Sequence, residues 1–495
     1  MIASSMLSII FRARPFPGPA LSLMSKSRQY MSIRDVVLGL DPSDTAIKQF
    51  NHDYPQCSVV KGRYVSPWTM DTEKSAIDVL DYVWNRRQNK LRLPGMKAKN
   101  SRKLLEPSEP ITKAKVEESF AHARLNNQVP VTWIGHATCY FEVDGVRFMT
   151  DPLFCERAAP IEWLGPKRFF PVGCSATELH TDVVLLSHTH YDHMDKRAVR
   201  AIGNKALWLV PLGVRRLLAR LGVTRCIEMN WWDSHRIQIN ADGTVSADGE
   251  NSETWHQEQN AEPGVQVSFT PAKHWTSRNF FDRNTCLWGS FAVVSEINDQ
   301  RVFFAGDTAY CDVFKTIGER FGPFDLALIP IGAYEPRYFL KHHHCNPEEA
   351  ITIHQDIRAK QSLAIHWGTF PLADEDAVEP ALELGRSRGV HDVHTSEFFT
   401  LRLGETYLCG NPVVSDFSEM HETLQEYYDN HAEAKIERMA AQEERVDRIK
   451  NALNVKKRLR KGMEKVKARR KSISAAASAT AATMTSTKHS LGREK

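Results

Sequence analysis

The 495-residue sequence lacks long apolar runs and paired cysteines. No stretch approaches the roughly 18 consecutive apolar residues that a membrane-spanning helix needs, so we expect at most peripheral membrane contact. The 9 cysteines are odd in number and scattered, without a CxxC pair. This usage argues against a disulfide framework and favours a reducing compartment. The remaining composition, 42% hydrophobic and 25% charged, is typical of a globular protein with a sizeable core.

The net charge of +4 is unevenly distributed. Residues 456–471 carry ten Lys or Arg and one acid, a charge of +9 that leaves −5 for the rest of the chain. An acidic remainder weighs against nucleic acid as a partner. Residues 1–34 contain five basic side chains, several serines and no acid, a composition typical of an organelle transit peptide. The compartment stays undecided between the mitochondrion, slightly favoured by this leader, and a cytoplasmic membrane leaflet, which the +9 segment would bind.

Changes in residue pattern divide the chain into four parts. We interpret 1–34 as a leader, 35–128 as a lead-in that packs on the core, 129–410 as the catalytic domain, and 411–495 as a charged helix with a disordered Ala/Ser/Thr tail. A solvated face, an anionic membrane and a coiled-coil partner are the alternatives for the charged helix.

The catalytic part combines short apolar runs with helical patterns, which predicts a layered α/β body. Asp144-Gly145 lies between two of these runs and predicts a two-residue hairpin turn. Residues 241–263 are polar and rich in Gly and Asn, which predicts a solvated loop insertion.

A dense group of metal-binding side chains follows one predicted strand. The segment SHTHYDH places His188, His190, Asp192 and His193 within six residues on a strand-end loop. Imidazole and carboxylate groups at this spacing can face two neighbouring metal ions, the first two residues one ion and the last two the other.

Two metal ions need more ligands, and three further candidates each end an apolar run. They are His274 in PAKHW, Asp307 in FAGDT and His366 in LAIHWG. Taken alone, His274 or His366 would as readily be structural. Because all of them follow strands, we expect them to meet at one edge of the sheets.

Several blocks together resemble a known family. HTHYDHMD, GDT and IHWGT are similar to motifs of the metallo-β-lactamase superfamily. WIGHAT, GPKRF, GDTAYC, IPIGAYEPR and AIHWGTF follow in the order of the N-acylphosphatidylethanolamine-hydrolysing phospholipase D family, and the resemblance spans roughly residues 60–405. It implies an αββα four-layer sandwich, here with an N-terminal extension and a C-terminal basic helical tail.

The resemblance also implies a site and a reaction. It implies two Zn²⁺ ions per chain, bridged by Asp307 and held by seven ligands: His188, His190, Asp192, His193, His274, Asp307 and His366. Asp192 and Asp307 are the implied catalytic residues, and Asp192 also orients the nucleophile. The implied reaction is hydrolysis of N-acylphosphatidylethanolamine by a metal-bridging hydroxide, giving N-acylethanolamine and phosphatidic acid.

Five more residues are candidates for the surroundings of the metals or for substrate contact. His136 and Asp151 would orient ligand imidazoles, whereas Tyr334, Arg337 and His344 would contact the lipid phosphate. Structural ion pairs or a solvated loop are equal alternatives for the last three.

The expected partners are a phospholipid and a peripheral membrane surface, with a homodimer left open. A lactonase or nuclease of the same fold is the nearest alternative. A membrane scaffold with a vestigial metal site is the alternative outside the enzymes.

Overall fold

The computed structural model describes most of residues 110–437 and shorter segments on either side. The described residues are 54–68, 102–107, 110–159, 163, 165–248, 263–279, 281–437, 440, 441, 444, 447 and 448. The predicted leader and the predicted Ala/Ser/Thr tail lie outside them. Contacts divide the chain into Met1–Tyr54 and Pro55–Lys495, and the elements below belong to the second unit. The boundaries predicted at 129 and 410 stay predictions.

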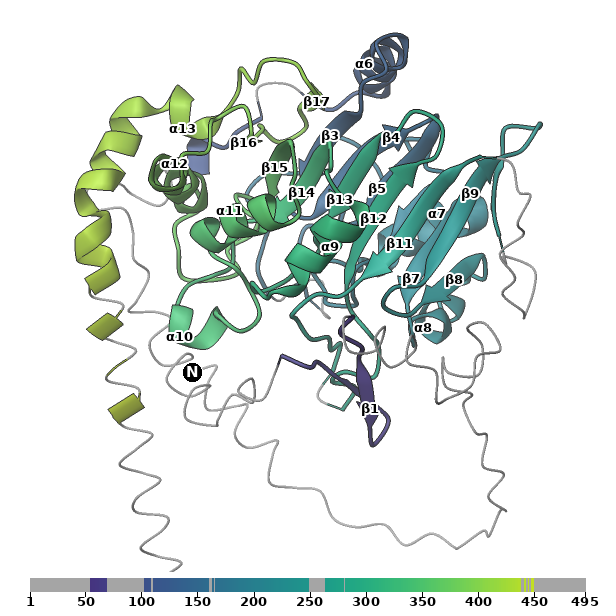
Figure 1. The fold of residues 1–495 in the computed structure, drawn as a ribbon, viewed down its shortest axis with the longest axis horizontal. Coiled ribbons are helices and arrows are strands. Elements are labelled where there is room, and N and C mark those ends of the chain that lie inside the picture. Colours follow the sequence, from purple (N-terminus) through teal and green to yellow (C-terminus); the bar gives the residue numbers. More distant parts are fainter. Residues whose placement is uncertain are drawn as a thin grey trace, which may run out of the picture. The chain divides into compact units, whose positions relative to one another are not determined.

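Two mixed sheets form the centre of the Pro55–Lys495 unit (Figure 1). The seven-stranded sheet consists, in spatial order, of β17 (Thr406–Leu408), β3 (Pro130–Gly135), β4 (Thr138–Val143), β5 (Val146–Thr150), β6 (Val183–Leu185), β7 (Leu207–Pro211) and β8 (Cys226–Met229). The eight-stranded sheet consists of β10 (Val245–Ala247), β9 (Ser234–Ile239), β11 (Val265–Thr270), β12 (Ser290–Ser295), β13 (Arg301–Phe304), β14 (Leu326–Pro330), β15 (Gln361–Ile365) and β16 (Phe398–Phe399). A separate hairpin pairs β1 (Ser58–Val60) with β2 (Arg63–Val65).

Both sheets are built in the same way. Their first strands along the chain pair antiparallel, and the strands that follow, from β5 to β8 and from β13 to β16, pair parallel. The turn predicted at Asp144-Gly145 joins β4 to β5, and φ angles of 45° and 81° there confirm it. β7 and β14 are buried throughout, because both faces of these parallel strands are covered. Their sequences are therefore continuously apolar.

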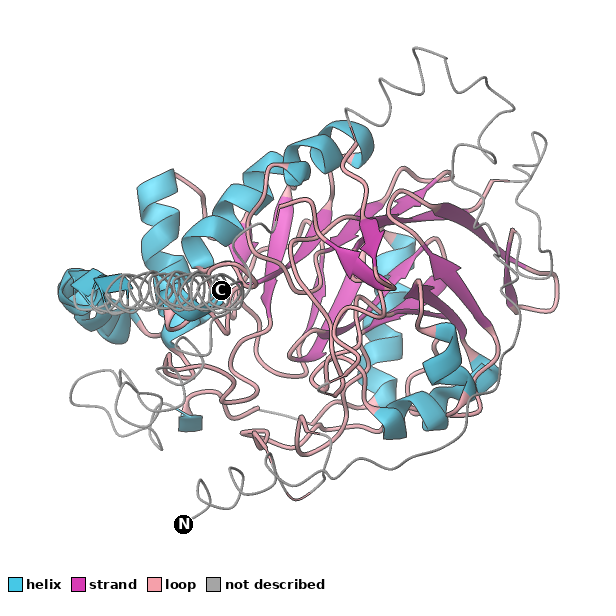
Figure 2. Ribbon diagram, turned by 90° about the horizontal axis from the view of Figure 1, so that it is seen from below, coloured by secondary structure: helices cyan, strands magenta, loops and turns pink. Residues whose placement is uncertain are grey.

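Helices cover the outer face of each sheet, so the layers run αββα (Figure 2). The seven-stranded sheet is covered by α6 (Lys113–Leu125), α7 (Lys196–Ile202), the 3-10 turn η1 (Gly203–Lys205) and α8 (Arg215–Ala219). The eight-stranded sheet is covered by α9 (Val313–Phe321), α11 (Pro347–Asp356) and α12 (Glu379–His391), with α10 (Arg337–Leu340) and α13 (Phe417–Met420) as short flanking helices. The predicted four-layer sandwich is confirmed. None of the described helices has the length and apolarity to cross a bilayer.

Two local predictions need correction. The predicted loop insertion at 241–263 contains a strand, β10, because its residues pair with β9; positions 249–262 lie outside the described residues. The charged C-terminal segment is helical over 422–437, but one face of it is buried and includes Tyr428 and Lys435. The sequence pattern suggests a solvated helix because the buried side chains are themselves polar.

Candidate metal centre

The candidate ligands lie where strands end, at one edge of the two sheets. They are the segment 187–193 after β6, His274 after β11, Asp307 after β13 and His366 after β15. Asp307 and His366 follow β13 and β15, two parallel strands of one sheet that have β14 between them, and 187–193 follows a parallel strand of the other sheet. The two sheets therefore deliver the predicted residues to a common point, as the sequence predicts.

One group combines His188, His190, His274 and Asp307. The Nδ1 atom of His190 lies 2.9 Å from Nε2 of His188 and 3.2 Å from Nε2 of His274. An Asp307 oxygen lies 3.9 Å from the His188 nitrogen and 3.7 Å from the His274 nitrogen. Three imidazole nitrogens and a carboxylate oxygen thus face one point.

A second group combines His136, Asp192, His193 and His366. Nε2 of His193 and Nε2 of His366 are 3.3 Å apart, and both lie within about 3.7 Å of Asp192 Oδ2. Asp307 reaches this group too, at 3.1 Å from His193 and 3.0 Å from His366. Asp307 therefore lies between the two groups, in the position predicted for a bridging ligand.

Contacts behind the ligands fix which nitrogen points into the cluster. His193 Nδ1 donates to Asp151 at 2.6 Å, and His188 Nδ1 donates to Ser187 Oγ at 2.9 Å. The Ser187 hydroxyl donates in turn to Asp151 at 2.5 Å. His274 Nδ1 donates to a backbone carbonyl 2.8 Å away. Each of these rings therefore turns the lone pair of Nε2 inward, as the ligand of a metal ion must.

His136 and Asp151, predicted to orient ligands, both lie in the cluster. Asp151 is fully buried beneath His193, and His136 lies 3.1 Å from Asp192 with its ring centre 3.9 Å from that of His366. His136, Asp151 and His366 have φ angles of 56°, 31° and 62°. Non-glycine residues in this left-handed region carry backbone strain of about 1–3 kcal/mol each, and such strain concentrates at functional sites.

The close approach of two ligand loops also demands a glycine. Gly306, which precedes Asp307, has a φ of 59°, and a Cβ atom there would lie 2.6 Å from Cβ of Ser187. Only a residue without a side chain lets the loop of Asp307 reach the loop that begins at Ser187.

The electrostatics suit cation binding. Burial lowers the pKa of His190 to about 3 and that of His274 to about 4, so both rings are neutral near pH 7. Burial would also lower the pKa of His366, but Asp307 and Asp192 outweigh it and raise the pKa to about 9. Burial alone would raise the pKa of Asp307, but His193 and His366 hold it well below its usual value. The cluster therefore contains ionised carboxylates and, at His190 and His274, neutral rings that can bind a cation.

The residues present fit two metal ions. His188 Nε2 and His190 Nδ1 lie 2.9 Å apart, and the buried Nε2 of His190 has no hydrogen-bond partner among the described residues, so this ring has a nitrogen available for a cation. Asp307 Oδ1 is buried and accepts no hydrogen bond among the described residues. A set of imidazoles and carboxylates suits zinc or another first-row transition metal, and the donors alone do not choose among them.

The other predicted contacts divide into two cases. His344 joins the cluster, with Nδ1 3.9 Å from Asp307 Oδ2. Tyr334 instead donates to Glu379 at 3.1 Å. Arg337 pairs with Glu349 at 2.8 Å and donates to the His344 carbonyl at 3.0 Å. The side chains of Tyr334 and Arg337 do not make the predicted phosphate contact, because Glu379 binds the Tyr334 hydroxyl and Glu349 binds the Arg337 guanidinium.

Sequence reasoning missed Arg278, four residues after His274. Its guanidinium donates to the carbonyls of Thr189 and Met194 at 2.7 and 3.1 Å and lies 4.2 Å from the centre of the Tyr191 ring. Arg278 thus binds the backbone of the ligand loop at Thr189 and at Met194. Arginine is common near many sites, and only its spacing after His274 could have indicated it.

Two cavities adjoin the cluster. One, of about 100 Å³, is lined by His366, by apolar side chains that include Phe169, Phe370 and Leu372, and by Arg102, Asp374, Glu375 and Asp376. The other, of about 260 Å³, lies beside Tyr191 and is mainly basic: its charged lining residues are Glu156, Arg157, Asp195, Lys196, Arg197, Arg200 and Arg278. The surroundings therefore offer an apolar contact and a cationic one.

Comparisons with known proteins agree with this geometry. Residues 146–367 match the family model described as the beta-lactamase superfamily domain. The chain is 36% identical over 320 residues to N-acyl-phosphatidylethanolamine-hydrolyzing phospholipase D 1 of Caenorhabditis elegans, covering 62% of this chain and 82% of the worm protein. It is 36% identical over 258 residues to the Saccharomyces cerevisiae protein named N-acyl-phosphatidylethanolamine-hydrolyzing phospholipase D, mitochondrial, covering 51% of this chain and 50% of the yeast protein.

Solved structures resemble the chain more distantly. The metallo hydrolase Igni18 of Ignicoccus hospitalis is 20% identical, with a TM-score of 0.39 over 58% of this chain and 100% of that protein. A metal-dependent hydrolase of Veillonella parvula is 15% identical, with a TM-score of 0.42 over 57% of this chain and 99% of that protein.

Proposed function

The chain belongs to the N-acylphosphatidylethanolamine-hydrolysing phospholipase D family of the metallo-β-lactamase superfamily, and we propose that it hydrolyses N-acylphosphatidylethanolamine to N-acylethanolamine and phosphatidic acid. It is a metal-dependent hydrolase by family, and we propose Zn²⁺ as its metal. The observation that carries the proposal is the convergence of two ligand groups on Asp307. The 36% identity to two relatives named for this reaction supports the substrate.

The chain's own residues would divide the work as follows. Zn²⁺ held by the two ligand groups would supply Lewis-acid chemistry for phosphodiester hydrolysis at neutral pH. Asp307, with its side chain 1% exposed and in contact with both groups, would contribute its carboxylate to both. Asp192, with its side chain 19% exposed, is the more accessible carboxylate and would orient the attacking water from that side. Asp151 holds the His193 ring in place from behind.

The two cavities fit an anionic amphiphile. The basic cavity beside Tyr191 would attract the phosphate-bearing part of a lipid, since its lining carries more positive than negative side chains. The apolar side chains beside His366 would contact an acyl chain. The charge of −5 outside residues 456–471 weighs against a nucleic acid as the substrate.

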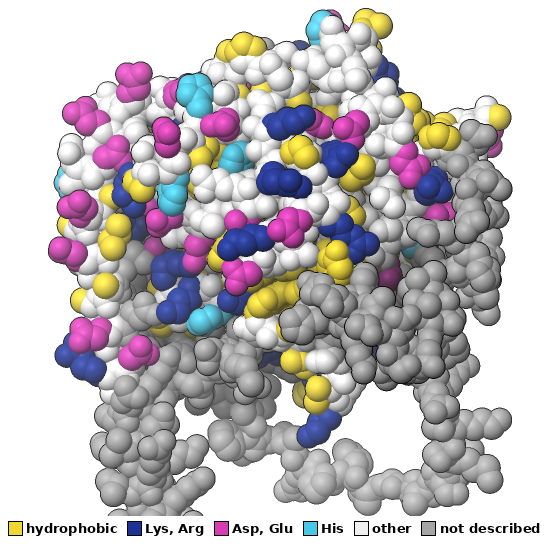
Figure 3. All heavy atoms as spheres, viewed as in Figure 1, with side chains coloured by type: hydrophobic (Ala, Val, Ile, Leu, Met, Phe, Trp, Pro, Cys, Tyr) yellow, Lys and Arg dark blue, Asp and Glu magenta, His cyan; other side chains and the backbone are white. Residues whose placement is uncertain are grey.

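The β1–β2 hairpin offers a surface for a lipid bilayer. Val59 and Val60 at its tip are 59% and 53% exposed, and Phe281 is 84% exposed. Arg63 donates to the Phe281 carbonyl at 2.8 Å, so these apolar side chains lie close together and beside cationic ones. Figure 3 shows apolar and basic side chains together where β1 projects from the body. Apolar tips flanked by cations are typical of peripheral contact with anionic membranes.

A mitochondrial location is part of the proposal. It is supported by the yeast relative's name and by the basic, acid-free composition of residues 1–34.

The reaction is tested with the full chain and N-acylphosphatidylethanolamine in mixed micelles. Mass spectrometry should detect N-acylethanolamine and phosphatidic acid in equal amounts, and Asp307→Asn and Asp192→Asn should abolish both. Release of fatty acid instead, or no product from a metal-loaded protein, would contradict the proposed reaction and indicate a hydrolase with another substrate.

The bilayer contact has a separate test on anionic vesicles. Val60→Asp and Phe281→Asp should each weaken vesicle binding about tenfold, because each removes roughly 1.5–3 kcal/mol of apolar contact. Ile297→Asp is the matched control: Ile297 is 60% exposed, but it follows the end of β12 that lies away from the metal centre. Equal loss in the control would refute this surface, and activity in micelles should be unchanged in all three variants.

A further inference from the structure

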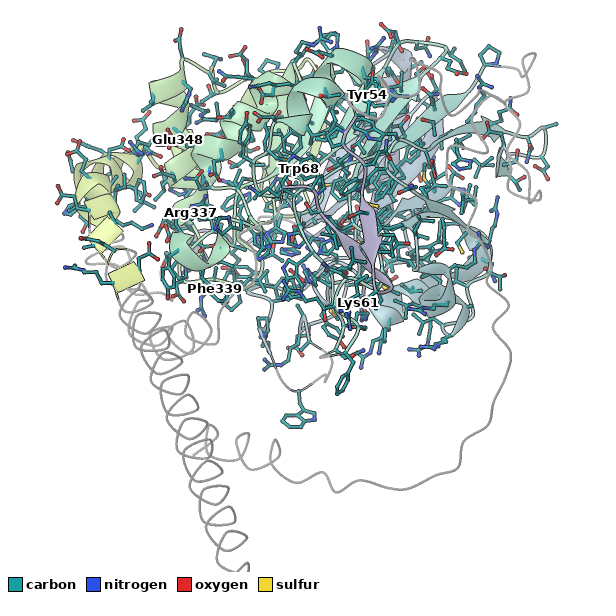
Figure 4. All side chains as sticks on the ribbon, turned by 60° about the horizontal axis from the view of Figure 1, so that its bottom comes forward. Tyr54, Lys61, Trp68, Arg337, Phe339 and Glu348 are labelled. Carbon is teal, nitrogen blue, oxygen red and sulfur yellow. The ribbon has the colours of Figure 1, made fainter. Side chains whose placement is uncertain are left out.

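The C-terminal helix is docked on the body through one face. Within residues 422–437, Tyr428, Ala432 and Lys435 are 4%, 2% and 9% exposed. Spacings of four and three residues place them on the same side of a helix. Figure 4 shows this helix running along the side of the body on which Arg337 and Glu348 lie.

Polar contacts join this face to the start of α12. The Tyr428 hydroxyl donates to Glu383 at 2.7 Å. The Lys435 ammonium forms an ion pair with Glu379, which is 1% exposed, and lies 5.9 Å from the centre of the Tyr334 ring. Such contacts are specific, because a buried carboxylate without its cation is costly.

The backbones also approach closely. Gly385 of α12 faces Gln425 and Ser418, and a Cβ atom at that glycine would lie 2.6 Å from the Gln425 amide oxygen and 2.9 Å from Cβ of Ser418. Gln425 in turn donates to the Leu382 carbonyl at 2.9 Å. The helix is therefore seated against α12 and not merely close to it.

Lys435 enters a group of buried carboxylates. Besides Glu379, the group contains Glu335, which is 4% exposed, and Glu375. Burial raises the pKa of Glu335 to about 7, with a further rise from Glu375 and an opposing effect of Lys435. The Glu335 Oε2 atom has no hydrogen-bond partner among the described residues and borders a cavity of about 270 Å³ that Lys435 also lines.

The two arginines that line this cavity form ion pairs with other carboxylates. Arg337 pairs with Glu349 at 2.8 Å, and Arg386 pairs with Glu383 at 3.1 Å. Among the described residues that line the cavity, Lys435 is the cation that pairs with Glu379, and it opposes the raised pKa of Glu335 more strongly than Arg337 does.

The same carboxylates hold a wall of the metal centre. Glu375 accepts hydrogen bonds from the backbone N–H of Ala333 at 2.6 Å and of Glu335 at 3.0 Å. Ala333 has a φ of 64°, and a Cβ atom at the preceding Gly332 would lie 2.2 Å from the His366 carbonyl. Ala333, Glu375 and His366 line one cavity. A displacement of Glu375 would therefore also displace the backbone that packs against His366.

We propose that Lys435 is a positioning residue of the hydrolytic site: its ion pair with Glu379 and its attraction for Glu335 and Glu375 hold segments 331–335 and 371–379 in place beside His366. The C-terminal helix is then part of the working enzyme. The kinetic part of the test rests on the proposed function, whereas the exchange part does not.

The experiment uses the full chain with Lys435→Met, which keeps the stem and removes the charge. Amide hydrogen exchange should become at least about tenfold faster in 331–335 and 371–379, because those backbones lose their fixed partner. With N-acylphosphatidylethanolamine, kcat should fall about tenfold with bound metal unchanged. Lys435→Arg, which keeps the positive charge, should restore both values.

Arg448→Met is the matched control. Arg448 also lies in the C-terminal segment, but its pair with Glu444 spans 3.5 Å with both side chains about 70% exposed. Faster exchange confined to 417–437, with 331–335 and kcat unchanged, would overturn the proposal, as would equal effects in the control. If Lys435→Met fails to fold, Lys435→Gln carries the test, since it also removes the charge but keeps a hydrogen-bond donor: faster exchange in 331–335 with a lower kcat supports the proposal, and wild-type values of both overturn it. A wild-type chain that does not hydrolyse the lipid defeats the proposed function alone, because exchange still reports on Lys435.

Discussion

Asp151→Ala should separate ligand orientation from ligand identity. Asp151 does not belong to the predicted ligand set, yet it accepts from Ser187 N at 2.7 Å, from Ser187 Oγ at 2.5 Å and from His193 Nδ1 at 2.6 Å. The substitution removes the acceptor that turns His193 Nε2 toward the metals, and leaves three buried donors unpaired.

The size of the effect follows from these contacts. Loss of an acceptor behind a ligating imidazole costs 10- to 100-fold in metal affinity. Unpaired donors cost about 1–3 kcal/mol each in the free energy of unfolding, so a loss of roughly 3 kcal/mol or more is expected. Asp151→Asn should have a metal affinity and a free energy of unfolding between those of the wild type and Asp151→Ala, because the amide has one oxygen that accepts hydrogen bonds where the carboxylate has two.

Chelator competition, read by mass spectrometry of bound metal, gives the affinity, and denaturant titration of the metal-free protein gives the stability. Asp195→Asn is the matched control: Asp195 is a buried carboxylate that caps α7 by accepting from Arg197 N at 2.8 Å, and Asn caps helices equally well. Unchanged metal affinity in Asp151→Ala would refute the orienting role, whatever happens to stability.

Three further predictions concern stability, pH and packing. Arg388→Met should lower the free energy of unfolding by about 3–5 kcal/mol, measured by denaturant titration, because it strands the 1%-exposed Asp416 whose carboxylate lies 3.0 Å from the guanidinium. Carboxylates raise the pKa of His366 to about 9, so the His366 proton stabilises the metal-free protein fully below about pH 6.5, and this stabilisation should be lost as the pH rises toward 9. Metal binding at pH 7.5 should therefore release a proton. Calorimetry in buffers of different ionisation enthalpy would detect this release. Gly332→Ala should displace His366 and reduce bound metal, since its Cβ would lie 2.2 Å from the His366 carbonyl, whereas Gly389→Ala in α12, with no atom within 4 Å, should retain metal and gain stability.

Most of the site could be predicted from the sequence because each ligand lies in a loop that follows a strand. His188, His190, Asp192 and His193 follow one apolar run, and a short run has few ways to present them. A change from apolar strand to polar loop is visible in a single sequence, so the positions of His274, Asp307 and His366 could be predicted as well, and the structure brings all seven together.

What could not be predicted depends on contacts between distant segments. Nothing in the local pattern distinguishes Arg337, which pairs with Glu349, from an arginine that faces a phosphate. Lys435 is one cation among many in a charged helix, and its burial depends on carboxylates that lie some 50 to 100 residues earlier. The short β10 strand forms because β9 offers an edge for pairing, although the segment around it is polar.

The central claim is that two metal ions share Asp307. It is tested most directly by the metal content of the full chain after dialysis, with Asp307→Asn in parallel. The account predicts about two equivalents of metal, chiefly zinc, in the wild-type protein and less than one in the variant, because both ligand groups lose the carboxylate between them. A wild-type chain that retains no stoichiometric metal, or a variant that still retains two equivalents, would contradict it.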